Sequence, residues 1–297
     1  MNKTNQTDSV ALARGKLILA MTIFGTIGIF VRYIPLPSSV IACVRGFVGV
    51  AFLLLVTILK KSKISFNDIK KNLILLFISG AFIGINWILL FEAYRYTTVA
   101  TATLCYYMAP IFVTIASPFI LKEKLTVKKI LCILTALIGM VFVSGILGTD
   151  SLQISVLGII CGLGAAFFYA CVILLNKFIK DISAYDKTMT QLLVASGVIL
   201  PYTLLTADVS LSDLNAKALI CLFIVGVVHT GFSYMIYFSS ISTLKAQTVA
   251  IFSYIDPVIA IILSALFLKE KMGIFGIIGA VLILGSTLLS ELTFKKK

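Results

Sequence analysis

The chain has 297 residues, of which 60% are apolar and only 12% are charged. Soluble proteins carry about 25% charged residues, so this chain has too few to cover a surface that faces water. The composition excludes a soluble enzyme, a disordered chain and a secreted disulfide scaffold, and indicates a protein that uses lipid as its solvent.

The positive charge has a distribution typical of a membrane protein. The formal net charge of +13 comes from 25 Lys and Arg against 12 Asp and Glu. The basic residues form short clusters between apolar runs, and no continuous basic face exists that could follow a phosphate backbone. We therefore expect membrane lipid, and no nucleic acid, among the partners.

Apolar runs long enough to cross a bilayer, about 20 residues as a helix, divide the whole chain. The first run lacks a small-residue cleavage site and exceeds the apolar core of a signal peptide, so we expect it to be a span. The runs are apolar throughout rather than alternating, which predicts helices. We therefore predict an all-α polytopic membrane protein with ten transmembrane helices. The runs lie near residues 16–34, 38–59, 72–95, 97–121, 130–148, 154–176, 187–207, 217–241, 246–268 and 273–291.

The Lys and Arg residues between these runs predict the orientation. Nineteen fall in segments on the same side as the N-terminus, five fall on the other side, and Arg45 lies within a span. Because cytoplasmic loops carry the excess of basic residues, we expect a cell-membrane protein with both termini in the cytoplasm.

The middle of the chain matches itself when it is shifted by 147 residues. Eleven of the 41 positions from 84 to 124 are identical to their counterparts, including a Leu-Lys-Glu-Lys run that begins at Leu121 and again at Leu268. Five spans, an odd number, separate matching points, so the copies should cross the membrane in opposite directions. The other identities pair Gly84, Phe91, Thr101, Tyr107, Pro110, Ile115 and Ser117 with Gly231, Phe238, Thr248, Tyr254, Pro257, Ile262 and Ser264.

The match predicts two inverted five-helix repeats, residues 1–148 and 149–297. Inverted repeats are the architecture of many secondary transporters, whose substrate site lies near the midplane where the halves meet. The alternative is a duplication that merely builds a stable ten-helix bundle.

A proline and a glutamate recur at equivalent places in the two copies. Pro110 lies in the fourth span with Glu123 after it, and Pro257 lies in the ninth span with Glu270 after it. Arg45 in the second span, and an acidic residue just before Pro257, belong to the same pattern. Over nearly the whole chain these features resemble the EamA-type branch of the drug/metabolite transporter superfamily.

The resemblance implies a transporter that exports or exchanges amino acids, other metabolites or drugs, without naming the cargo. Two positions depart from the family pattern. Cys132 and Ser286 stand where the fifth helix of each copy often carries Gly. Both residues are small, so close helix packing is still expected.

His229 and Asp256 form a polar pair at the predicted midplane. Ionisable groups inside a membrane are expensive unless they are paired or face water. The residues 147 positions earlier are Phe82 and Ala109, so the symmetry of the fold does not require this pair. One interpretation is a substrate or proton site, in which the carboxylate pairs with the imidazole or with a substrate amine. The other is a structural hydrogen bond between the eighth and ninth helices.

Arg45 and Glu92 lie at similar depth near the outer ends of the second and third spans. We predict that they form a structural or gating ion pair. The alternative, charges that extend to the lipid headgroups, suits Glu92 better than Arg45.

Aromatic and amide residues near mid-span complete the candidate substrate site. Trp and Tyr are normally enriched at the membrane interfaces, so a central position is informative. Trp87 aligns with Tyr234 under the shift, and Tyr107 aligns with Tyr254. Plain core packing is the alternative for each. The predicted substrate-binding residues are Asn86, Trp87, Tyr107, His229, Tyr234, Tyr254 and Asp256.

Pro110 and Pro257 are predicted to interrupt the fourth and ninth helices. Each proline frees a carbonyl one turn back and bends the helix. In transporters such breaks serve as hinges and expose backbone acceptors.

The leading hypothesis is a secondary transporter of small organic solutes, most consistent with efflux of amino acids or similar metabolites, with protons as a candidate coupling ion. No Walker motif is present, so we do not expect ATP as the direct energy source, and we expect no cofactor. We expect no metal, because the six cysteines form no CxxC pair and the chain has one His. The alternatives are an intramembrane enzyme, with Thr230 or Ser233 beside His229 as a nucleophile, and a non-transporting sensor or scaffold. The oligomeric state stays open.

Overall fold

The computed structural model describes residues 3–96, 102, 105–143, 155–208, 214–267 and 274–291, and every regular element in these ranges is a helix. The prediction of an all-α protein is therefore confirmed. The helices are α1 (Lys3–Val31), α2 (Ser38–Leu59), α3 (Phe66–Lys71), α4 (Leu73–Tyr96), α6 (Ala109–Ile120), α7 (Val127–Val143), α8 (Val156–Leu175), α9 (Ala184–Thr206), α10 (Ala216–Ile224), the π-helix η3 (Val225–Phe232), α11 (Ser233–Thr243), α12 (Ala246–Phe252), α13 (Ile255–Phe267) and α14 (Ile274–Glu291).

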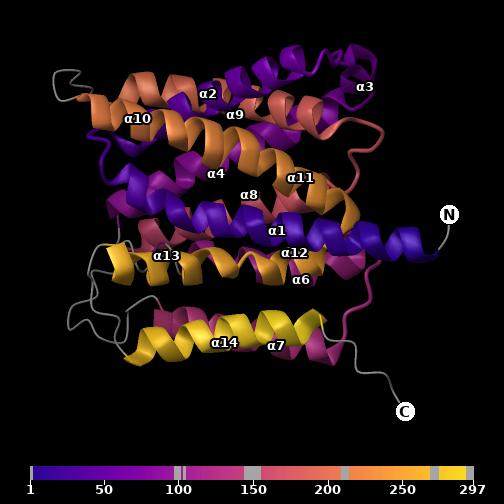
Figure 1. Ribbon diagram of the computed structural model, residues 1–297. Coiled ribbons are helices and arrows are strands. Elements are labelled where there is room, and N and C mark those ends of the chain that lie inside the picture. Colours follow the sequence, from indigo (N-terminus) through magenta and orange to yellow (C-terminus); the bar gives the residue numbers. More distant parts are fainter. Residues whose placement is uncertain are drawn as a thin grey trace.

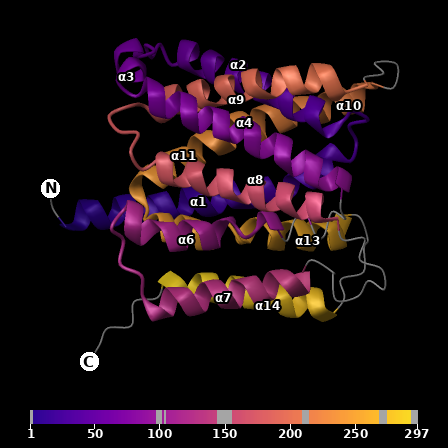
Figure 2. The same ribbon diagram turned by 180° about the vertical axis from the view of Figure 1, so that it is seen from behind.

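The long helices lie roughly parallel to one another in a layered bundle (Figures 1 and 2). From one edge to the other, the layers are α2 with α9, α4 with α11, α1 with α8, α6 with α12 and α13, and α7 with α14. Each layer contains helices from the first and from the second half of the chain. The core is therefore built between the two halves rather than inside each one.

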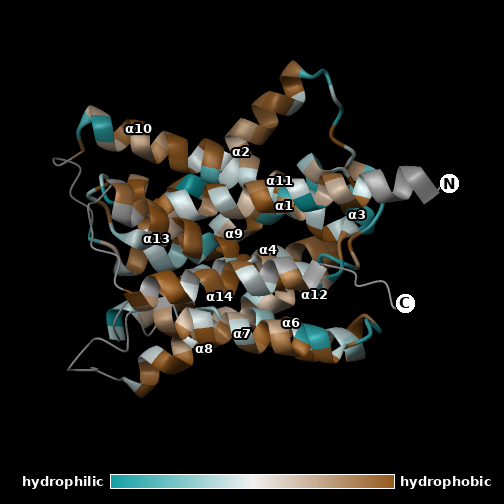
Figure 3. Cartoon of the chain, turned by 60° about the horizontal axis from the view of Figure 1, so that its bottom comes forward, coloured by the Kyte–Doolittle hydropathy of each residue, from teal (hydrophilic) through white to brown (hydrophobic). Residues whose placement is uncertain are grey.

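Within the described ranges, six helical stretches are long and apolar enough to cross a membrane: Ser9–Val31, Ser38–Leu59, Leu73–Tyr96, Val156–Leu175, Ala184–Thr206 and Ala216–Thr243. Large apolar side chains are also exposed along much of the outer surface, and many outer stretches of the helices have the brown colour of hydrophobic residues in Figure 3. Phe119 and Leu205, for example, are 83% and 86% exposed. An outer surface of this kind is stable against lipid and unfavourable in water.

The other predicted runs contain shorter helices, because two of them are interrupted beside a proline. The run at 246–268 is divided into α12 and α13, and Pro257 cannot donate a hydrogen bond to the carbonyl of Ser253 at the break. The run at 97–121 contains α6, which has Pro110 in its first turn. Residues 97–101, 103, 104, 144–148, 154, 268 and 273 of the predicted spans lie outside the described residues.

The run at 217–241 also differs from the prediction, because its middle is the π-helix η3. The hydroxyls of Thr230 and Ser233 donate to carbonyls five residues earlier, at 2.9 and 2.8 Å. The widened turns lie against α2, where a Cβ on Gly231 would be only 3.1 Å from the carbonyl oxygen of Gly49. Apolar patterning cannot distinguish a π-helix from an α-helix, and π-helical turns are common at functional sites.

Lysines gather at one end of the bundle, which we name the basic end. There α2, α6, α8 and α11 end and α9 begins, and in Figure 1 it is the end that carries α3. Contacts between its segments include those from Lys60 Nζ to the Tyr185 hydroxyl at 2.7 Å and from Asn72 Nδ2 to the Lys180 carbonyl at 2.9 Å. Its lysines include Lys60, Lys61, Lys63, Lys70, Lys71, Lys122, Lys124, Lys128, Lys129, Lys177, Lys180, Lys187 and Lys245. The described basic residues of the opposite end are Arg32, Arg95 and Lys217.

The carboxylate of Glu123 joins the two halves of the chain at the basic end. It accepts hydrogen bonds from the backbone N–H groups of Ala246 and Gln247, at 2.8 and 3.3 Å. These are free N–H groups at the start of α12, where a negative charge is favourable. The glutamate that the sequence marked as part of a repeated motif is therefore a helix cap.

Candidate functional site

A cavity of about 270 Å³ lies in the middle of the bundle, between helices of both halves of the chain. Its lining is mostly aromatic, and Arg45 and Asp256 are its only charged residues within the described part of the chain. Four of the seven predicted substrate-binding residues line it: Trp87, Tyr107, Tyr234 and Asp256. The other lining residues are Met21, Phe24, Ile27, Arg45, Leu90, Tyr94, Tyr106, Tyr169, Tyr237 and Ser253.

Several lining residues are related by the same shift of 147 residues that relates the two halves. Trp87 corresponds to Tyr234, Leu90 to Tyr237, and Tyr106 to Ser253, and all six face the cavity. The sequence analysis selected only the first of these pairs. Applying the shift one turn further along the same helix would have found the second.

The guanidinium of Arg45 lies over the ring of Trp87, 4.4 Å from its centroid. Its Nε atom is buried and has no hydrogen-bond partner among the described residues. An aromatic face attracts a cation, and more strongly where water is excluded. The cavity therefore contains a cation that the described part of the protein does not neutralise with a carboxylate.

The predicted Arg45–Glu92 ion pair is wrong. Glu92 instead accepts a hydrogen bond from Arg95, one turn later on α4, at 2.9 Å, and another from the hydroxyl of Tyr202 on α9. Arg45 points toward Trp87 and the cavity, which Glu92 does not line. The similar depth of Arg45 and Glu92 in the membrane suggested the pair. The direction in which each side chain leaves its helix determines its actual partner.

Asp256 approaches the cavity from the first turn of α13. The hydroxyl of Tyr107 lies within hydrogen-bonding reach of its carboxylate. Tyr254 lies behind Tyr107: the two rings stack with centroids 6.1 Å apart, and the Tyr254 hydroxyl donates to the Tyr107 carbonyl at 3.1 Å. Tyr254 is fully buried and supports the site without lining it.

His229 and Asn86, two further predicted substrate-binding residues, do not line the cavity. The His229 ring packs against Phe30, and its Nε2 lies 2.7 Å from the hydroxyl of Thr26 on α1. The amide of Asn86 donates to the carbonyl of Ala165 on α8 at 2.6 Å. Both residues therefore join neighbouring helices, and the structure does not bring His229 to Asp256.

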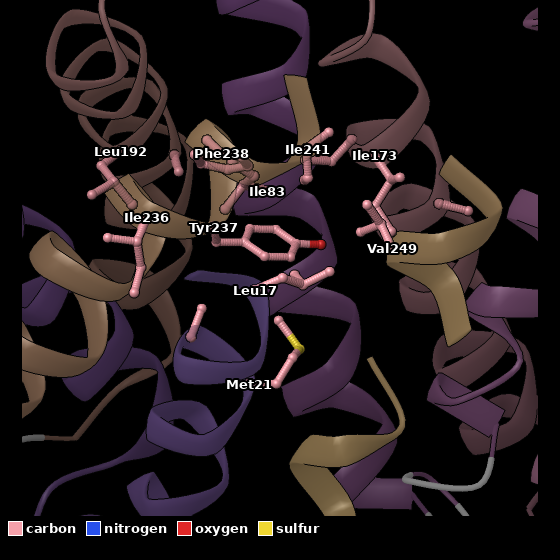
Figure 4. Close-up of a cluster of buried hydrophobic side chains, with 14 of the residues drawn as sticks. Leu17, Met21, Ile83, Ile173, Leu192, Ile236, Tyr237, Phe238, Ile241 and Val249 are labelled. Atoms are coloured by element: carbon pink, nitrogen blue, oxygen red, sulfur yellow. The ribbon is translucent and has the colours of Figure 1, made fainter. Parts of the chain in front are cut away.

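A cluster of buried apolar side chains lies between the cavity and the basic end, and Figure 4 shows several of its members around Tyr237. The hydroxyls of Tyr169 and Tyr237 lie 2.7 Å apart between this cluster and the cavity. On α1, Leu17 belongs to the cluster, whereas Phe24 and Ile27, which are nearer the opposite end, line the cavity. The cavity thus extends away from the basic end. The cluster includes Leu17, Met21, Ile173, Tyr237, Phe238, Ile241 and Val249.

Pro110 and Pro257, which are 147 residues apart, both lie where the chain passes the cavity. Pro110 follows Tyr106 and Tyr107 of the lining, and Pro257 follows Ser253 and Asp256. The interrupted helices therefore carry their lining residues at the breaks. Within the described ranges, no three His, Cys, Asp or Glu side chains gather as a metal site would require.

Comparison with known proteins identifies the family. The model of the EamA-like transporter family matches the chain twice, over residues 15–145 and 156–292. The uncharacterized transporter YxxF of Bacillus subtilis (strain 168) is 32% identical over 273 residues, which cover 90% of this chain and 86% of that protein. The uncharacterized transporter YoaV of the same organism is 26% identical and covers 88% and 90% of the two chains.

The fold also occurs among solved structures. A crystal structure superposes with a TM-score of 0.81 at 15% sequence identity and covers 96% of each chain. At this identity the likeness concerns the fold alone. The double family match, the relatives and the apolar helices together lead to one conclusion: the chain is a multi-pass membrane protein of the EamA-like transporter family, within the drug/metabolite transporter superfamily.

Proposed function

We propose that this protein is a secondary transporter that exports small zwitterionic solutes, amino acids or related metabolites, across the cell membrane. The observation that carries the proposal is the central cavity, in which Arg45 and Asp256 face one aromatic-lined space. A guanidinium recognises a carboxylate, and a carboxylate recognises an ammonium group. Trp and Tyr rings supply an apolar surface, and ammonium groups also bind to aromatic faces.

The volume of the cavity supports a small solute. Its volume of about 270 Å³ lies just below the usual range for ligand pockets, about 300–1,000 Å³. A molecule the size of one amino acid is appropriate to this space, and a bulky drug is not.

Ten spans arranged as two inverted five-helix repeats account for the packing. Under the shift of 147 residues, α1 corresponds to α8, α11 to α4, and α13 to α6. The contacts follow the same correspondence, because α1 packs against α11 and α13 as α8 packs against α4 and α6. A two-fold relation of this kind allows two nearly equivalent packings, and rocking one half against the other would produce alternating access.

The charge distribution supports an orientation with the basic end, and both termini, in the cytoplasm. In that orientation the apolar cluster of Figure 4 closes the cytoplasmic side. The cavity then faces outward, and the Tyr169–Tyr237 hydrogen bond lies at the inner gate. Pro110 and Pro257 are the hinges of this scheme, and Glu92 with Arg95 and Tyr202 is a polar cluster near the outer gate.

Asp256 is the residue we assign to proton coupling. It is the carboxylate of the cavity, so it can carry a proton in one conformation and bind a substrate amine in the other. His229, the other titratable residue that the sequence suggested, is outside the cavity and is assigned a structural role.

Counterflow into proteoliposomes tests the proposal, with a panel of amino acids, nucleosides and cationic drugs. We expect accumulation of a zwitterionic solute, and at least about a tenfold loss in Asp256→Asn because a charge-assisted bond to the substrate is removed. The matched control is Asp68→Asn, which makes the same change on α3, outside the cavity. Full transport by a well-folded Asp256→Asn protein would remove Asp256 from the mechanism, and accumulation of no zwitterion would overturn the substrate class.

A further inference from the structure

A second cleft, of about 470 Å³, lies at the basic end and is separate from the transport cavity. It is formed by the segment between α8 and α9, the first turns of α9, and the last turns of α11. Three of its nine lining residues are lysines and two are serines. The lining residues are Lys177, Ile179, Lys180, Asp181, Ile182, Ala184, Lys187, Ser239 and Ser242.

Lys187 is buried and Lys177 is half-buried, and neither forms an ion pair among the described residues, although Glu123 lies near Lys177. Lys187 is only 3% exposed, and its Nζ donates to the carbonyl of Phe238 at 2.9 Å. Lys177 donates to the carbonyl of Ile241. Both side chains lie close enough together for their charges to repel each other. Burying an ammonium group is unfavourable unless its charge is compensated and its hydrogen bonds are made.

A purely structural role accounts for only part of this arrangement. Phe238 and Ile241 are in the last turns of α11, whose carbonyls carry a partial negative charge that attracts lysines. That partial charge, about half an elementary charge, does not neutralise two ammonium groups, and Lys180 adds a third. Each ammonium group has three N–H donors, so donors remain on both Lys177 and Lys187.

The remaining charge and donors point to an anion. Asp181 is the only acidic residue that lines the cleft within the described part of the chain, so the lining carries three positive charges against one negative charge. Asp186, in the first turn of α9, does not line the cleft and accepts a hydrogen bond from the backbone of Ser65 instead. The hydroxyl of Ser239 adds a donor that can rotate toward a ligand, whereas that of Ser242 donates to the carbonyl of Ser239 at 2.7 Å.

We propose that this cleft binds a phosphate group, through Lys177, Lys180 and Lys187. Lysine ammonium groups and serine hydroxyls are suited to phosphate oxygens. The position at one end of the bundle fits the headgroup of an anionic lipid, because basic pockets between transmembrane helices bind such headgroups. A water-soluble phosphorylated compound has the same chemistry. The bound phosphate group would contact both the α8–α9 connection and the end of α11, and would link them.

Native mass spectrometry of the full-length protein in detergent tests the site, with dioleoyl-phosphatidylglycerol and glycerol 3-phosphate as the two probes. We expect one-to-one binding of the lipid. In Lys177→Gln/Lys180→Gln the affinity for the lipid should fall by at least about tenfold, because two charged donors are removed. The control is Lys63→Gln/Lys70→Gln, which removes the same charge at exposed positions of the same end. If the double variant does not fold, Lys180→Gln alone tests the site, because Lys180 is exposed and its replacement should not disturb the fold.

The two probes distinguish a lipid headgroup from a soluble phosphate compound as the source of the phosphate. Binding of the lipid alone, lost in the cleft variants, identifies a lipid site, and equal binding of glycerol 3-phosphate identifies a site for soluble phosphate compounds. Binding of neither probe, or equal weakening in the cleft and control variants, overturns the proposal. None of these outcomes depends on transport activity.

Discussion

The guanidinium of Arg45 stacks on the indole of Trp87, the chain's single tryptophan, with 4.4 Å between the guanidinium carbon and the ring centroid. This contact holds the cation at the cavity wall, with its Nε atom buried and without a hydrogen-bond partner in the described part of the chain. It also makes the fluorescence of Trp87 a direct reporter of the site.

Arg45→Lys should weaken substrate binding although the charge is kept. Lysine lacks the planar fork that binds a carboxylate through two N–H groups, and its cation–π contact is weaker. We expect affinity to fall about tenfold, corresponding to ~1.4 kcal/mol, measured by substrate-dependent change in Trp87 fluorescence. Trp87→Phe, which should abolish the signal, is the control. An unchanged affinity in Arg45→Lys would show that the guanidinium does not contact the substrate.

Removing the hydrogen bond between Tyr169 and Tyr237 should favour opening at the basic end. Tyr237→Phe keeps the ring and removes a bond worth about 0.5–1.5 kcal/mol, which shifts a two-state equilibrium about two- to tenfold. Pulsed electron paramagnetic resonance between labels at Lys63 and Lys124, in a background without the native cysteines, measures the two populations.

The double variant of these tyrosines provides the control for that measurement. Tyr169→Phe should have the same effect as Tyr237→Phe, and the combination should add little, because both changes remove one bond. Additive shifts would mean that each hydroxyl acts separately, and no shift at all would exclude this bond as part of a gate.

His229→Gln should leave transport close to the level of the unchanged protein. The imidazole bonds Thr26 and packs on Phe30 outside the cavity, and a glutamine retains a polar group for that contact. We expect a loss of stability of about 1 kcal/mol from the imperfect replacement, seen as a lower Tm, with the same pH dependence of counterflow. A changed pH profile would instead place His229 in the proton pathway.

Glu123→Ala should destabilise the protein without altering the cavity. The carboxylate caps the first N–H groups of α12, and loss of such a cap costs about 1 kcal/mol. The thermal unfolding of purified protein measures the effect, with the neighbouring exposed Lys124→Ala as control. Equal melting temperatures for Glu123→Ala and the unchanged protein would contradict a capping role.

Stability should rise as the pH increases from about 8 to about 10.5. Burial lowers the pKa of Lys177 from its usual 10.5 to about 8, with nearby Glu123 acting in the opposite direction. In that window the unfolded chain binds the proton and the folded protein does not, so higher pH favours the folded state. Below pH 8 both states are protonated and the unfavourable burial of the charge is fully present.

Thermal unfolding across this pH range checks the effect in Lys177→Met. The variant should show a smaller rise in Tm with pH than the unchanged protein, whereas Lys70→Met, at an exposed position, should not. A rise of the same size in Lys177→Met would mean that the ammonium group is not buried at neutral pH.

The apolar pattern alone determined much of the fold. The run predicted at 38–59 is the helix Ser38–Leu59, because a proline precedes it and lysines follow it. The self-match of the chain predicted which helices are equivalent, and it placed Trp87 and Tyr234 together at the cavity. Both predictions depend on spacing along the chain, which the sequence contains directly.

Tertiary structure decided which way each polar side chain points. Depth in the membrane follows from counting residues, so the sequence placed Arg45 near Glu92 and His229 near Asp256. Partners depend on the rotation of each helix about its axis, which the packing of neighbouring helices sets. Arg45 therefore meets Trp87, His229 meets Thr26, and the lysines from α9 and the segment after α8 converge on one cleft.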